Sequence, residues 1–146
     1  MSEQVEHAIQ IIEKLLKDWN IPPETVKDKG GKNIWYLKQG SADFHIELFT
    51  LNKGEGYGIV DCIEVGGTIM KVPQANVLPL YKKLLEMNST AVGIYFALRW
   101  TPKGDGLIML LSTREVAGID YNELKIIQLS ISKIRQRMKD EVDILK

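Results

Sequence analysis

The first part of the chain has the spacing of an amphipathic helix. From Ser2 onward, apolar residues recur at intervals of three and four, which is typical of a helix with one apolar stripe. These residues are Val5, Ala8, Ile9, Ile12, Leu15, Leu16 and Trp19. Asn20 and the pair Pro22-Pro23 follow, and proline disfavours helical geometry in the residue before it. The pattern therefore predicts a helix that begins after Ser2 and ends near Asn20.

The next part of the chain predicts three β-strands joined by hairpins. Residues 33–38 form a short aromatic run, and from residue 42 apolar and polar residues alternate strictly, which is typical of a strand with one wet face. Residues 57–65 form a third such run, and glycine-containing turn segments separate the three. Gly66-Gly67 predicts a bend, beyond which residues 68–72 continue the third strand around a corner.

The second half of the chain predicts a helix, a further hairpin and a closing helix. Asn76 is suited to cap a helix, because Pro79 then lies in the first turn, where proline is tolerated. Residues 92–100 and 107–112 alternate as two more strands around a hairpin loop. Asp120, with Glu123 three residues later, resembles a capping box in front of a long helix.

The predicted order is helix, three strands, helix, two strands, helix. The connections between strands are too short for parallel crossovers, so the five strands are expected to form an antiparallel sheet in an α+β protein. The chain shows no internal repeat and no linker long enough to divide it. We therefore expect residues 1–146 to form a single domain.

Composition and charge narrow the classes of partner. The 45% hydrophobic and 26% charged residues are those of an ordinary globular protein. The 19 basic and 19 acidic side chains balance to a net charge of zero, which leaves no positive field to attract a nucleic acid. The start of the chain is acidic and resembles no signal peptide, and the longest purely apolar stretch, residues 107–111, is too short to span a membrane. We expect a soluble cytoplasmic protein that binds neither nucleic acid nor membrane.

Few residues are suited to catalysis or to binding a cofactor. The single cysteine, Cys62, cannot form an intrachain disulfide, has no adjacent basic residue and is expected to be a packed thiol. The closely spaced glycines of residues 54–58 lie between two strands without the helix N-terminus of a phosphate-binding loop, so no nucleotide is expected. Trp19, Trp35 and Trp100 each end an apolar pattern and are expected to close the core. The sequence thus predicts no catalytic residue and no cofactor.

One polar cluster leaves metal binding or acid and base chemistry open. Asp43, His45 and Glu47 project from one face of the second strand, and Glu64 on the next strand is expected to lie near them. Carboxylates and imidazole in one place can hold a divalent cation or exchange protons. Alternating polar residues are equally expected on a solvated sheet face without any chemistry. A metal-dependent enzyme therefore remains one alternative.

The last two strands carry more apolar surface than a sheet with one wet face needs. In a monomer, Tyr95 and Ala97 would lie on the solvent-exposed face of the sheet. One of two sets on the fifth strand would share that face, either Leu107, Met109 and Leu111 or Ile108 and Leu110. Covering one exposed side chain of this size is worth roughly 1.5 to 3 kcal/mol. A helix of the same chain, a second subunit or a bound polypeptide is expected to cover them. Ile126 and Leu129 on the last helix widen this predicted interaction surface.

The second half of the chain also resembles a known family. The resemblance covers residues 80–137 and rests on the helix end Leu-Tyr-Lys-Lys-Leu-Leu-Glu-Met-Asn, the strands Gly-Ile-Tyr-Phe-Ala-Leu and Asp-Gly-Leu-Ile-Met-Leu, and the closing helix. In these it looks like the YbjN-type family of proposed bacterial sensory transduction regulators, whose fold is like that of type III secretion chaperones. The resemblance implies a small curved antiparallel sheet with helices packed against it, no cofactor, and a role in holding another polypeptide or a second copy of the chain.

From these observations we expect a non-enzymatic, chaperone-like or regulatory protein-binding module. It would act as a homodimer or hold a partner polypeptide through the apolar sheet and helix surface. A regulatory protein that binds a small ligand is the alternative from another class.

Overall fold

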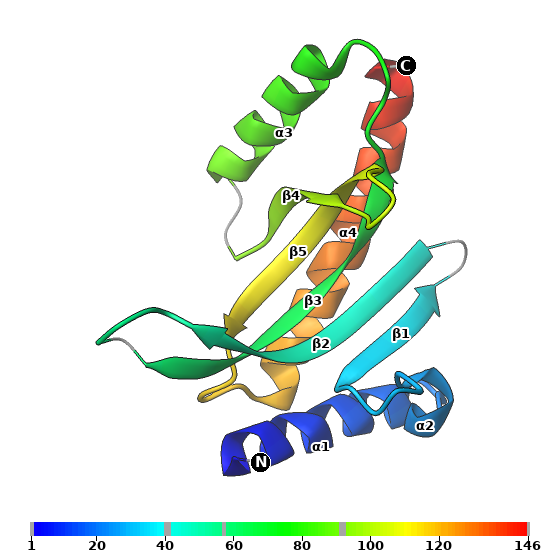
Figure 1. Cartoon of the computed structure of the whole chain (residues 1–146). Helices are drawn as coiled ribbons and strands as arrows, with labels where there is room; N and C mark the ends of the chain where they lie inside the picture. Colours follow the sequence, from blue (N-terminus) through cyan, green and yellow to red (C-terminus); the bar gives the residue numbers. More distant parts are fainter. Residues whose placement is uncertain (1, 40–41, 57, 91–92, 146) are drawn as a thin grey trace.

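The chain forms an open antiparallel sheet whose helices pack into one core with it (Figure 1). This computed structural model describes residues 2–39, 42–56, 58–90 and 93–145. The elements in chain order are α1 (Glu3–Asp18), α2 (Pro23–Val26), β1 (Ile34–Gln39), β2 (Ala42–Asn52), β3 (Ile59–Lys71), α3 (Val77–Thr90), β4 (Tyr95–Trp100), β5 (Gly106–Glu115) and α4 (Tyr121–Leu145). The predicted α+β class and five-stranded antiparallel sheet are confirmed.

The strands lie in the order β1-β2-β3-β5-β4, so that β1 and β4 form the two edges of the sheet. The long strands β2 and β3 occupy its middle, and β3 continues through Gly66-Gly67 without a break. The irregularity lies just beyond the glycines, where the register between β3 and β5 shifts between Thr68 and Met70. The predicted starts of the third and fourth strands, residues 57 and 92, lie outside the described residues.

The described residues form four helices, one more than the three predicted. The additional helix, α2, is a single turn that begins at Pro23. The sequence predicts Pro22-Pro23 only as the end of a helix. Proline at the first helical position, however, lacks an N–H group that the helix does not need there, and its fixed φ suits a new turn. None of the helices in the described ranges has both the length and the apolar character that crossing a bilayer requires.

At two of the three predicted helix starts the residue before the helix caps it. The Ser2 hydroxyl accepts a hydrogen bond from the Val5 backbone N–H at 3.2 Å, and the Asp120 carboxylate accepts one from the Glu123 N–H at 2.8 Å. Asn76 directly precedes α3 but has a φ of 58°, whereas an N-cap residue is usually extended. Asn76 thus lies at the predicted position, directly before the helix, with Pro79 in the first turn, but its backbone is left-handed.

One face of the sheet forms the core. The helices contribute buried side chains from α1, α3 and α4 to the same cluster as the strands, so these helices cover a single sheet face. The strand residues of this cluster are Trp35, Leu37, Phe44, Ile46, Ile63, Val65, Phe96, Ile108 and Leu110, the last two lying on β5, and Ile94 joins them just before β4. Strand alternation then places the other set, Met109 and Leu111, on the face without helices.

Leu111 is buried on the helix-free face by its own sheet. It is 1% exposed, and its Cδ2 atom lies only 2.4 Å from where a Cβ of Gly66 would stand. Gly66 on β3 pairs with Leu111 on β5, so the missing side chain of Gly66 leaves the space that Leu111 fills. Beside it Met109 is 7% exposed and accepts a weak hydrogen bond from the Thr68 hydroxyl. The expectation that a helix, a second subunit or a bound polypeptide must cover Met109 and Leu111 is wrong.

The three tryptophans have different environments. Trp35 is fully buried, and Trp19 packs against the core, as predicted. Trp100 is 63% exposed, so its predicted place in the core is wrong. Its ring lies against Gly106, the residue it faces on β5. Because Trp100 ends the edge strand, no element of the sheet lies beyond it to cover the ring.

Candidate functional site

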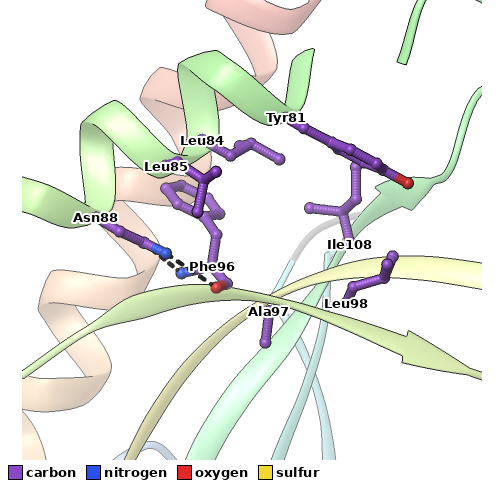
Figure 2. A pocket seen from close by; sticks show the side chains of 8 residues that line it. All are labelled: Tyr81, Leu84, Leu85, Asn88, Phe96, Ala97, Leu98 and Ile108. Carbon is purple, nitrogen blue, oxygen red and sulfur yellow. Dashed lines mark hydrogen bonds between the residues drawn. The ribbon is translucent and has the colours of Figure 1, made fainter. Parts of the chain in front are cut away.

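An apolar hollow of about 210 Å³ lies between α3 and β4 (Figure 2). Its lining residues come from α3, β4 and β5 and are Tyr81, Leu84, Leu85, Asn88, Phe96, Ala97, Leu98 and Ile108. Figure 2 shows Leu84 and Leu85 extending from α3 beside Phe96, whereas the Ala97 side chain points away from the others. We call this hollow the α3–β4 groove.

The groove exists because α3 has more apolar surface than the sheet covers. Leu80 and Leu84 are the buried residues of this helix, while Leu85 is 68% exposed at the rim of the groove. On the other side of the groove, Leu98 of β4 is 42% exposed. Moving a fully exposed side chain of this size out of water stabilises it by roughly 1.5 to 3 kcal/mol. The groove is thus a place where covering by another molecule is favourable.

The β4 strand presents a partly open edge beside the groove. The Asn88 side chain accepts a hydrogen bond from the Phe96 N–H at 2.7 Å and donates one to the Phe96 carbonyl at 3.1 Å (Figure 2). Both backbone groups of Phe96 therefore point away from β5. Backbone direction alternates along a strand, so Leu98 and Trp100 also point their N–H and C=O groups outward. In the described part of the chain these groups have no hydrogen-bond partner.

The opposite edge of the sheet is better protected. Trp35 of β1 forms an isolated bridge with Lys27, and α2 packs beside that strand. Unpaired edges invite pairing with another chain, and natural proteins commonly cover or block them. Of the two edges, β4 is therefore the one that offers a place for an added strand.

The helix-free face carries a cluster of charged side chains around Glu64. The Glu64 side chain is 3% exposed, and its Oε2 atom accepts a hydrogen bond from His45 Nε2 at 2.7 Å. Arg99 binds both oxygens of the same carboxylate, with Nη1 lying 3.0 Å from Oε2. The Thr113 hydroxyl lies 3.4 Å from Oε1 and also contacts the Tyr95 hydroxyl at 2.9 Å. The carboxylate is thus surrounded by donors from three other strands.

These donors keep Glu64 ionised. Burial by itself raises the pKa of Glu64, but the hydrogen bonds and positive charge of His45 and Arg99 outweigh it and lower the pKa from 4.5 to about 2. The same ion pair raises the pKa of Arg99. The cluster therefore holds a fixed negative charge paired with a fixed positive one.

The predicted carboxylate and imidazole cluster is present in part. Ligand atoms of His45, Glu47 and Glu64 lie within 4.8 Å of one another, while Asp43 is not a member of this group. Such a set suits a divalent cation such as zinc. Arg99, His45 and Thr113 already occupy both oxygens of Glu64, however, so a cation could use this carboxylate only by displacing one of these donors. The geometry favours a structural ion pair over a metal centre.

The predicted interaction surface does not form one patch. The residues Tyr95, Ala97, Leu107, Met109 and Leu111 do share a sheet face, as the register of β4 and β5 shows. Two of them are buried there, and Tyr95 is 37% exposed. Ile126 and Leu129 are exposed at 62% and 46%, but they lie on α4, which packs on the other face. The structure thus divides these residues between two sides of the sheet.

Other motifs have the environment predicted for them. Cys62 is buried, and burial together with nearby Glu115 raises the pKa of its thiol. In the glycine-rich segment, the Lys53 N–H donates to the Gly58 carbonyl, which closes a hairpin loop between β2 and β3. Tyr57 lies outside the described residues. Neither feature adds a reactive group to the site.

The groove itself was missed from the sequence. Leu85, Leu98 and Trp100 belong to apolar stripes of the sequence, and stripes of this kind usually face a core. A sequence signal was present, because Asn88 lies in the last turn of a helix and only a few residues before an apolar strand. A side chain that can both donate and accept at that place is able to pair with a strand edge.

Comparisons with known proteins support the fold. No protein-family model matches the chain, and no curated protein matches it in sequence. The chain is similar to a solved structure, that of YbjN, a proposed transcription regulator from E. coli. The similarity has a TM-score of 0.56 at 15% identity and covers 88% of this chain and 86% of the other. At this identity it shows the arrangement of elements alone. The chain therefore has the YbjN-type fold that its second half resembled in sequence.

Proposed function

We propose that this protein is a non-enzymatic binding module whose α3–β4 groove holds an extended apolar segment of a partner polypeptide, in the bacterial cytoplasm. The observation that supports it is the open edge at Leu98 and Trp100, which lies beside exposed apolar side chains. Strand addition gains main-chain hydrogen bonds along an edge, while alternate side chains enter a neighbouring pocket. β4 offers both an edge with outward main-chain groups and a neighbouring apolar groove.

The exposed groups favour an extended partner over a helical one. The outward N–H and C=O groups of Leu98 and Trp100 are able to pair with the backbone of an extended segment, whereas a helix uses its own backbone groups internally. Asn88 already pairs with Phe96 as a neighbouring strand would. A bound strand would continue that pairing toward Trp100 and place one apolar side chain between Leu85 and Leu98.

A second copy of the chain is a poorer fit to the same edge. Its own β4 would bring α3 with it, because Asn88 of α3 is bonded to the strand at Phe96. Pairing between two copies is therefore restricted to the few residues from Leu98 to Trp100 at which both edges are open. A free extended segment carries no such helix.

The likeness to YbjN is consistent with this proposal. That protein is described as a proposed transcription regulator, and regulators act by binding other macromolecules. The charge of this chain is balanced, which favours a protein partner over a nucleic acid. No step of the proposed function requires a reactive side chain.

The test begins with peptides selected for binding to the purified protein from a random display library. The best peptide is then measured against the wild type, Leu98→Lys and Leu85→Lys. We expect each variant to lose at least about tenfold in affinity, since each places a charge in an apolar contact. Leu129→Lys is the matched control, because Leu129 is 46% exposed, close to the 42% of Leu98, but lies on α4. It should bind like the wild type.

Two further measurements separate the alternatives. Methylation of every second backbone nitrogen in the peptide should abolish binding if the peptide pairs with β4, and should have little effect if only side chains are held. Light scattering gives the oligomeric state. A dimer that Leu98→Lys dissociates would assign the groove to a second copy and contradict the proposal. So would selected peptides that bind all variants equally.

A further inference from the structure

A strand added at β4 would present side chains to both faces of the sheet, because side chains alternate along a strand. The residues opposite Leu98 and Trp100 would lie on the side of the α3–β4 groove, and the residue between them would lie opposite Arg99. Arg99 shares a face with Ala97, whose side chain points away from the groove residues (Figure 2). The surroundings of Arg99 therefore determine which side chain suits that middle position.

Arg99 is the only charged residue of β4, and its guanidinium is within reach of an added strand. Its side chain is 46% exposed, whereas that of its partner Glu64 is 3% exposed. The Glu64 carboxylate accepts hydrogen bonds from Nη1 and Nη2. A guanidinium carries more N–H donors than one carboxylate uses, so Nε–H and an outer Nη–H remain as a second pair. Nε–H has no partner in the described part of the chain.

The charges around Arg99 favour a carboxylate at that position. In the row of the sheet that contains Arg99, Leu107 of β5 separates it from Lys71, an exposed residue at the end of β3. The acidic residues Glu47 and Glu64 lie on β2 and β3, so Arg99 stands between them and an added strand. A segment at the β4 edge therefore meets a positive charge first.

We propose that the segment bound at β4 carries an acidic side chain, glutamate or aspartate, between two apolar ones, and that its carboxylate bonds to the free N–H pair of Arg99. This inference rests on the proposed function, because it requires a strand at that edge. Arg99 turns its own backbone groups toward β5, and opposite residues at such a position of an antiparallel pair bring their side chains closest. Opposite charges placed there stabilise the pairing, and a two-point contact of arginine with carboxylate adds direction.

The probe is a synthetic peptide of sequence Thr-Thr-Thr-Val-Xaa-Val-Thr-Thr-Thr with both ends blocked. Its β-branched residues favour the extended form. The sequence is the same in both directions, so either strand direction that sets the valines opposite Leu98 and Trp100 places Xaa opposite Arg99. Three versions carry glutamate, glutamine or lysine at Xaa. Glutamine has nearly the shape of glutamate, so the difference between these two versions reports the charge.

Each peptide is titrated into the full-length ¹⁵N-labelled protein, and binding is followed by NMR. The Leu98 N–H and the Trp100 indole report binding at the edge, while the Arg99 Nε–H reports the carboxylate. We expect the glutamate peptide to bind about threefold more tightly than the glutamine peptide and about tenfold more tightly than the lysine peptide. The Arg99 Nε–H signal should shift with the glutamate peptide and much less with the glutamine peptide.

A pair of protein variants assigns the preference to Arg99. Arg99→Gln removes the positive charge, so the preference for glutamate over glutamine should fall from about threefold to about onefold. Lys103→Gln is the matched control, because it removes the same charge at an exposed position of the hairpin after β4 and should keep the preference. Arg99→Gln also leaves Glu64 without its arginine. The comparison of the three peptides on the wild type needs no variant and holds even if Arg99→Gln fails to fold.

Two results would overturn this proposal and leave the proposed function intact. One is equal affinity for the three peptides together with shifts at Leu98, which would mean that the edge binds a strand without regard to charge. The other is a preference for glutamate that persists in Arg99→Gln. Absence of binding by all three peptides would instead contradict strand addition at β4, and with it the proposed function as well.

Discussion

Arg99 on β4 and Glu64 on β3 form a bidentate ion pair although β5 lies between their strands. Their neighbours on β5 are Leu107 and Thr113, positions that a flat strand would hold about 20 Å apart. The contact shows that the sheet departs from a flat ladder here, since twist and coiling bring side chains of non-adjacent strands together. Arg99 therefore crosses β5 on this face and ties the edge strand that bears the groove to the middle of the sheet.

Replacing Glu64 with glutamine should reduce the loss of stability in acid. Because the folded-state pKa of Glu64 is lowered to about 2, its contribution is complete above about pH 4.5 and is lost as the pH falls toward 2. The free energy of unfolding of the wild type, measured with urea between pH 5 and pH 3, should fall more steeply than that of Glu64→Gln. Glu86→Gln, at an exposed position of α3, serves as the control and should follow the wild type. Equal slopes for the wild type and Glu64→Gln would contradict the prediction.

Gly66→Ala should destabilise the fold by about 2 to 3 kcal/mol, since inserting atoms into a filled space strains its surroundings. A Cβ at this position would lie 2.4 Å from Leu111 Cδ2 and 2.6 Å from the Leu110 carbonyl oxygen. Urea unfolding measures the change. Gly30→Ala provides the comparison, because Gly30 lies in an exposed turn where the nearest atom is the flexible Asp28 carboxylate at 3.1 Å. If both variants unfold at the same urea concentration, the close packing of Leu111 on Gly66 is not important for stability.

Asn88→Ala should cost about 1 kcal/mol, because the Phe96 N–H and carbonyl lose their side-chain partners at a partly buried edge. Asn88→Asp keeps the acceptor for the Phe96 N–H and should recover part of that loss. Amide hydrogen exchange gives a local measurement: the Phe96 N–H should exchange faster in the alanine variant, whereas the Leu110 N–H should change little. Unchanged exchange at Phe96 would show that Asn88 does not protect this edge.

Cys62 should react slowly with a thiol reagent in the native protein. The side chain is 4% exposed, and burial raises the pKa of its thiol, so little reactive thiolate is present at neutral pH. The rate of labelling by a disulfide reagent at pH 7 should rise by orders of magnitude in concentrated urea, where the chain unfolds. Fast labelling without denaturant would show that β3 opens readily around this residue.

The sequence was sufficient for much of the local structure. The period of three and four predicted α1, strict alternation predicted β2, and Ser2 and Asp120 marked two helix starts that are observed. These features are predictable because they depend on residues a few positions apart in the chain. Pro23 shows the limit even of local patterns, since the same residue is suited to end one helix and to begin another.

What lies on each face was decided by the tertiary structure. Alternation shows that Leu111 and Leu110 point to opposite sides of β5, but not that Gly66 on another strand leaves room to bury Leu111. The exposed Trp100 follows from the strand order, which puts β4 at an edge, and the ion pair of Glu64 with Arg99 depends on how β3, β5 and β4 lie relative to one another in the folded sheet. Strand order and curvature arise from contacts between residues distant in the chain. Patterns of neighbouring residues therefore predicted the elements, while only the folded arrangement formed the groove and the polar cluster.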